Sequence, residues 1–97
     1  MNFTELEKKV IKWGEDRDLY KESTIEDQIN KLEEEFFELA SAELLDDQID
    51  AIGDMMVVMT HITKMLDITL TTCYATAYNE IKDRKGKMVN GLFVKEG

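Results

Sequence analysis

The chain of 97 residues carries 21 acidic against 12 basic residues, which gives a net charge of −9, and it contains one cysteine and no proline. This length sets one domain, and the acidic balance argues against binding to nucleic-acid polymers or to anionic membranes. An internal disulfide is excluded, and the first residues lack the basic and apolar regions of a signal peptide, so we expect a cytoplasmic protein of all-α fold.

The N-terminal segment predicts a first helix. Thr4 and Glu7 have the spacing of a capping box, and apolar residues at helical spacing follow until about Asp16. Gly14 weakens the end of this helix, because glycine is a poor helix former. Residues 17–22 are expected to be a polar connection.

A second helix is predicted from the repeated capping signal of Ser23 and Glu26, and it should end near Glu43. At about 100° per residue, four polar side chains then share one narrow stripe beside an apolar stripe. These side chains are Gln28, Lys31, Glu35 and Glu38.

The third predicted helix begins at Asp46 or Asp47, either of which can cap it, and ends near Leu66. One side of this helix is acidic and the other is rich in methionine and isoleucine. The polar side chains on the acidic side are Asp47, Asp50, Asp54 and His61. Gly53 predicts either a close helix approach, the more ordinary cause, or room for a ligand.

A fourth helix should start at Thr69 or Thr71 and end in a basic stretch that suits the negative end of a helix dipole. After Gly86, the dipeptide Asn90-Gly91 between apolar residues predicts a β-hairpin tail. Two strands are weak alone, and so short a chain is a marginal monomer. We therefore expect a homodimer or homotetramer.

Packing the apolar faces of the second and third helices against each other would bring Glu35, Glu38, Asp50 and Asp54 to one cleft. Four carboxylates in a partly desolvated cleft repel one another, and a hard divalent cation would offset this repulsion. Oxygen ligands of this kind suit Mg²⁺, or Mn²⁺ as a second possibility.

These residues carry a resemblance to a known family. Glu34, Glu35 and Glu38 match the Glu-Glu-x-x-Glu motif of the MazG-like all-α nucleoside triphosphate pyrophosphohydrolases, and nearly the whole chain is similar to their small single-domain members from phages and bacteria. Asp54 matches the aspartate of the family's Glu-x-x-Asp motif. Ala51 stands where that motif has its glutamate, so Asp50 is taken as the substitute ligand and Asp47 as the fallback.

The resemblance implies a four-helix bundle and Mg²⁺-dependent cleavage between the α and β phosphates of a nucleoside triphosphate, with a monophosphate and pyrophosphate as products. We assign metal binding to Glu35, Glu38, Asp50 and Asp54 and catalytic roles to Glu34, Glu35 and Glu38. Glu34 projects away from the metal stripe, so its expected role is either that of a base or that of a support behind the metal ligands. Residues expected at the substrate are Lys31, Asn79, Lys82, Arg84, His61 and Trp13. An ion pair with Glu35 is the alternative for Lys31, and ordinary polar and core roles are the alternatives for His61 and Trp13.

Other functions stay open. An acidic helical adaptor or regulator without catalysis would need no metal. The same fold could also act on a specialised nucleotide such as dUTP, dCTP or phosphoribosyl-ATP. Glycine-rich phosphate loops and Cys/His zinc sets are absent from the sequence.

Overall fold

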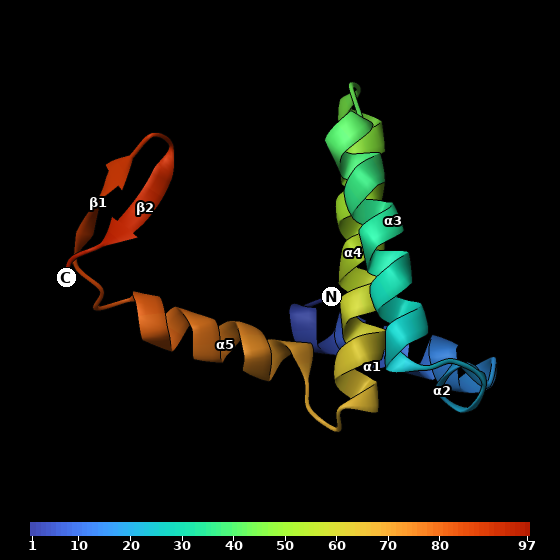
Figure 1. Ribbon diagram of the computed structural model, residues 1–97. Helices are drawn as coiled ribbons and strands as arrows, with labels where there is room; N and C mark the ends of the chain where they lie inside the picture. Colours follow the sequence, from blue (N-terminus) through green and yellow to red (C-terminus); the bar gives the residue numbers. More distant parts are fainter.

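The computed structural model of residues 1–97 is mostly helical, with a two-stranded antiparallel hairpin at the C-terminal end (Figure 1). The all-α prediction and the hairpin are thereby confirmed. The elements are α1 (Phe3–Asp16), α2 (Leu19–Glu22), α3 (Ile25–Ser41), α4 (Leu45–Met65), α5 (Leu70–Ile81), β1 (Gly86–Val89) and β2 (Leu92–Lys95).

The helices α3 and α4 form the central antiparallel hairpin and make the most extensive contact between elements (Figure 1). Ala51 and Val58 of α4 are the only buried apolar side chains of the chain. The same helix also buries Thr60, His61 and Thr63. The two threonine hydroxyls donate to main-chain carbonyls of their own helix, so that burial leaves neither without a partner.

The helix starts differ by a residue or two from the prediction. Asn2 caps α1, because its side-chain oxygen accepts a hydrogen bond from the Glu5 N–H at 2.9 Å, and the box predicted at Thr4 does not form. Thr24 and Asp27 form the capping box of α3, with reciprocal bonds of 3.0 and 3.1 Å. Ser23 is not available for this role, since it ends α2 by donating its N–H to a carbonyl of that helix.

At the start of α4 the predicted aspartate cap is absent. Leu44 occupies the N-cap position without a side-chain hydrogen bond, while Asp46 and Asp47 lie in the first turn. Their negative charges there still favour the positive end of the helix dipole.

The segment predicted as a polar connection contains the short helix α2, which follows Asp18 in the left-handed conformation (φ 57°). Gly14 of α1 leaves space for the side chain of Tyr20, which belongs to α2. A Cβ added at Gly14 would lie 2.8 Å from the phenol oxygen of Tyr20, so the ring of Tyr20 packs directly on the backbone of α1. The glycine that weakens α1 therefore allows this contact.

The start of α5 is stabilised by its own cap residue and by a side chain of the N-terminal helix α1. Thr69 caps the helix, as predicted, by accepting from the Thr72 N–H at 3.0 Å. The carboxylate of Glu7, which is 7% exposed, accepts from the Thr71 N–H at 3.0 Å and from the Thr71 hydroxyl at 3.1 Å. Glu7 thus serves α5 rather than the predicted box at the start of α1.

The β-hairpin turns at Asn90 and Gly91, which both have positive φ (51° and 83°), as a two-residue turn of this kind requires. Val89 pairs with Leu92 next to the turn, and Gly86 pairs with Lys95 at the open end. Every residue of both strands is exposed.

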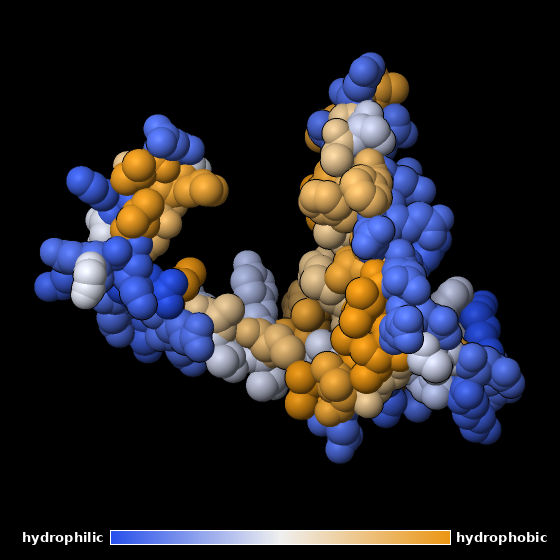
Figure 2. Space-filling model, in the orientation of Figure 1, coloured by the Kyte–Doolittle hydropathy of each residue, from blue (hydrophilic) through white to orange (hydrophobic).

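The predicted four-helix bundle is not seen in the single chain, because α5 and the hairpin project away from α3 and α4 (Figure 1). The accessible surface is 7644 Å², whereas a compact protein of this mass exposes about 5,700 Å². The radius of gyration is 15.9 Å, against about 12.5 Å for a compact chain of this length. Apolar side chains line the inner side of the resulting hollow in Figure 2.

The close helix approach predicted at Gly53 is also absent within the chain, since nothing lies within 4 Å of a Cβ added there. None of the helices combines the length and apolar character needed to cross a membrane.

Candidate functional site

Three carboxylates meet between α3 and α4. Glu35 and Glu38 come from adjacent turns of α3, and Asp54 comes from the facing part of α4. One oxygen of each lies within 4.8 Å of the other two. Glu35 is 4% exposed, whereas Glu38 and Asp54 are open to solvent, so the cluster has one buried and two accessible members.

The buried member is incompletely satisfied. Glu35 Oε1 lies 3.4 Å from the Lys31 ammonium, but Glu35 Oε2 is buried and has no hydrogen-bond partner. Burying a carboxylate oxygen without a donor or cation is costly, so a site of this kind favours a ligand that supplies positive charge. The three carboxylates could hold a metal ion, since each offers an oxygen ligand at the same point.

Lys31 lies at the edge of the cluster. Its Nζ is 3.5 Å from Glu34 Oε2 as well as 3.4 Å from Glu35 Oε1. The contact with Glu35, followed by the charge of Glu34, raises the pKa of Lys31, so the lysine carries its charge at neutral pH. Glu34 is exposed, faces Lys31 and lies outside the carboxylate cluster.

An acidic hollow of about 580 Å³ opens on one side of the cluster, near the turn between α3 and α4. Glu38 and Asp54 line it together with Asp47 and Asp50. Both of these aspartates therefore lie beside the cluster but outside the close group of three. Ala51, at the position where the resemblance expects glutamate, is 2% exposed and lines the same hollow.

A second hollow of about 580 Å³ opens on the other side, towards α1. It shares Glu35 and Asp54 with the cluster, and it also contains Lys31, His61 and Trp13. Three of the residues predicted to contact substrate therefore lie in one cavity that includes two of the predicted metal ligands.

His61 is held by aromatic neighbours in this second hollow. Its Nδ1 lies 2.8 Å from the hydroxyl of Tyr20, and its ring stacks on the indole of Trp13 with centroids 6.0 Å apart and planes inclined by 21°. Burial lowers the pKa of His61, which favours the neutral imidazole at neutral pH. Burial, and next the charge of Glu15, raises the pKa of Tyr20 to about 12, so the phenol keeps its proton.

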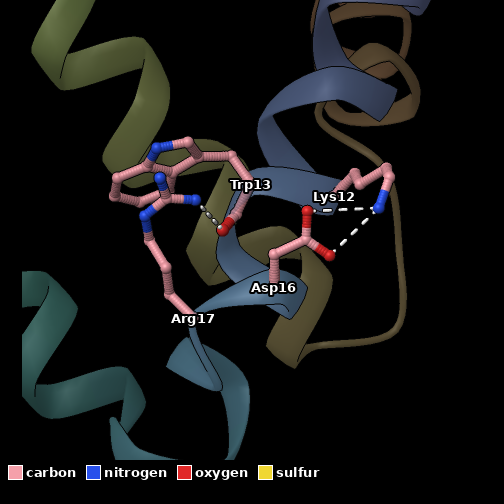
Figure 3. Close-up of polar contacts among 4 residues, drawn as sticks. All are labelled: Lys12, Trp13, Asp16 and Arg17. Carbon is pink, nitrogen blue, oxygen red and sulfur yellow. Dashed lines mark hydrogen bonds and ion pairs between the residues drawn. The ribbon is translucent and has the colours of Figure 1, made fainter.

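Trp13 is fixed on α1 by a cation–π contact. The guanidinium of Arg17 lies over the indole, 4.3 Å from the ring centroid, and donates a hydrogen bond of 3.0 Å to the Trp13 carbonyl (Figure 3). One position earlier in the chain, Lys12 and Asp16 pair at 3.0 Å (Figure 3). A planar ligand could stack on that face of the indole only if Arg17 moved.

The basic end of α5 does not reach the cluster within one chain. Asn79 lies near the end of α5, and Lys82 and Arg84 follow it, where the chain points away from α3 and α4 (Figure 1). None of the three residues lines either hollow. Within one chain these three residues therefore lie apart from the carboxylate cluster.

Tyr20 was missed by the sequence reasoning, which treated residues 17–22 only as a connection. An aromatic residue among charged neighbours, six positions after a glycine in a helix, was the available signal. The contact with His61 spans 41 residues, so local patterns alone did not indicate it.

The fold and the site together define a small, mostly helical protein with an acidic cluster between two antiparallel helices, which could hold a metal ion. Comparison of the chain with protein-family models, with curated protein sequences and with solved structures found no match.

Proposed function

We propose that this protein is a Mg²⁺-dependent nucleoside triphosphate pyrophosphohydrolase of the MazG-like type, which cleaves between the α and β phosphates. The observation that carries the proposal is the unpartnered Oε2 of buried Glu35 beside the carboxylates of Glu38 and Asp54. A purely structural acidic surface gives no reason to bury one of its carboxylates without a full set of partners.

Glu35, Glu38 and Asp54 would hold the metal, and Asp50 borders it in the acidic hollow. When bound, Mg²⁺ supplies charge neutralisation for the triphosphate and lowers the pKa of a coordinated water. Glu38 is exposed and makes no ion pair, so its second oxygen is free to take a proton from the attacking water. Mn²⁺ would be the alternative ion.

Lys31 binds phosphate in this proposal. Its side chain is half exposed, its Nζ lies 3.4 Å from Glu35 Oε1, and the residue lines the hollow that also holds His61 and Trp13. Glu34, which faces Lys31, orients the lysine and is the alternative base. The phosphates would then lie at the cluster and the nucleoside in the hollow near α1.

A second copy of the chain would complete the fold and the site. The surface exceeds that of a compact protein by roughly 2,000 Å², which is enough for a stable dimer interface. Packing α5 of one copy against α3 and α4 of another would close a helical bundle and bring Asn79, Lys82 and Arg84 to the carboxylates. Sedimentation at micromolar concentration should show a dimer or tetramer, and a compact monomer at every concentration would contradict this assembly.

The enzymatic test is pyrophosphate release from a panel of nucleoside triphosphates, with Mg²⁺, with Mn²⁺ and without metal. The panel includes dUTP, dCTP and phosphoribosyl-ATP, which separate a general from a specialised nucleotide hydrolase. We expect metal-dependent release that Asp54→Asn abolishes and Glu33→Gln leaves intact, because Glu33 is an exposed carboxylate of α3 outside the cluster. No release with any substrate and metal would favour the non-catalytic adaptor.

A further inference from the structure

The Tyr20 hydroxyl and His61 Nδ1 lie 2.8 Å apart, and the direction of their hydrogen bond depends on the tautomer of His61. The Tyr20 hydroxyl has no hydrogen-bond partner in the chain other than His61 Nδ1. Its ring end packs against Gly14, which offers no side-chain acceptor. Within the chain the Nδ1 lone pair is the one acceptor in reach of the phenol proton, and when the phenol donates to it the imidazole proton lies on Nε2.

His61 Nε2 makes no hydrogen bond within the chain, although the residue is only 3% exposed and lines the hollow near α1. Because Nδ1 is hydrogen-bonded to Tyr20 and Nε2 has no partner, Nε2 can form a hydrogen bond with a ligand in that hollow. The depressed pKa of His61 agrees with a neutral ring, which has one donor and one acceptor.

We propose that Tyr20 is a positioning residue that holds His61 as the Nε2–H tautomer, so that the hollow near α1 selects nucleobases with a keto oxygen at the contacted position over those with an amino group. The inference rests on the nucleotide ligand of the proposed function. A fixed N–H donor bonds to a carbonyl oxygen, whereas an amino group would place two donors against each other and leave both unsatisfied. Trp13 supports the ring of His61 from the stacked side.

The tautomer can be measured without any ligand. His61 is the only histidine, so its two ring nitrogens give unambiguous ¹⁵N signals. The wild type should show the Nε2–H form, and Tyr20→Phe, which keeps the ring and removes the hydroxyl, should show a mixture of both tautomers. A wild-type Nδ1–H form, or identical signals in the two proteins, would overturn the inference.

Base selection is measured by the binding of matched monophosphates in the presence of Mg²⁺: uridine against cytidine, and inosine against adenosine, each pair differing in a keto or an amino group. In at least one pair the keto member should bind about tenfold more tightly to the wild type, and the ratio should fall to about twofold or less in Tyr20→Phe. A preference for the amino member, no preference in either pair, or a preference that survives Tyr20→Phe would overturn the inference.

Pyrophosphate release measured in parallel separates this inference from the proposed function. A protein that cleaves triphosphates without a keto preference would overturn the inference alone. A protein that neither cleaves triphosphates nor binds any of the four monophosphates would overturn the proposed function and, with it, the ligand assigned to the hollow. Circular dichroism of Tyr20→Phe establishes that any change in selection comes from a folded protein.

Discussion

Replacing Asp54 by asparagine should stabilise the metal-free protein and abolish its response to Mg²⁺. Asp54 makes no hydrogen bond or ion pair in the chain, so the substitution removes no favourable contact of its side chain. It does remove the repulsion between Asp54 and the carboxylates of Glu35 and Glu38. The size and shape of the side chain are nearly unchanged.

The size of the effect follows from Coulomb's law. Two unit charges 4.8 Å apart, the upper limit between the ligand oxygens of the cluster, repel by about 0.9 kcal/mol in bulk water and about 3.5 kcal/mol at an effective dielectric constant of 20. Asp54 takes part in two such pairs. With screening by physiological salt, about 1 kcal/mol is a conservative gain in the free energy of unfolding. For a domain of this size, that gain raises Tm by roughly 4–8 °C.

Calorimetry on metal-free and Mg²⁺-loaded samples measures both parts of the prediction. Mg²⁺ at a hundredfold excess over Kd should stabilise the wild type by about 2.7 kcal/mol and the variant far less. Glu33→Gln is the matched control, because it makes the same change in net charge on α3 at an exposed position outside the cluster. A metal-free Asp54→Asn protein that melts below the wild type, or equal Mg²⁺ shifts in both, would refute the electrostatic reasoning.

Three further predictions concern single contacts. Lys31→Ala and Arg84→Ala should each raise KM about tenfold or more with a smaller change in kcat, and unchanged Michaelis constants in steady-state assays would remove both from the site. Glu7→Ala should lower the free energy of unfolding by about 1–3 kcal/mol, because it strips the start of α5 of a buried acceptor; urea unfolding that matches the wild type would contradict this. Gly14→Ala should not give the gain of about 1 kcal/mol in the free energy of unfolding that alanine brings to a helix, since the new methyl displaces Tyr20. Thermal melts measure the missing gain, and the His61 ¹⁵N signals report the displacement of Tyr20; a full gain with unchanged signals would contradict this.

The sequence was informative where structure depends on near neighbours. Apolar periodicity located α3, α4 and α5 to within a few residues, and Asn90-Gly91 located the hairpin turn. The exact cap residues were harder to predict, because Ser23 and Thr24 are adjacent and either can cap a helix. The short helix α2 was missed because four residues are too few to show a period.

In the candidate site, too, the sequence predicted the contacts between neighbouring helices but not those that depend on the direction of α5. Glu35, Glu38 and Asp54 meet as expected, because the spacing along α3 and one antiparallel pairing are enough to bring them together. The relation of Arg84 to these carboxylates depends on the direction in which α5 leaves α4, after Asp67 with φ 60°, and on surfaces that the single chain leaves uncovered. Local sequence patterns carry no information about such a direction.

The bond between Glu7 and Thr71 also bears on the order of folding. It joins residues 64 positions apart, whereas α3 and α4 are neighbours in the chain and can pair after closing a loop of three residues. Closing a long loop costs more conformational entropy than closing a short one, so the α3–α4 hairpin should form early and α5 should acquire its direction last, once α1 has docked. Any surface that includes α5 would then form after the carboxylate cluster, and subunits would associate when that cluster is already folded.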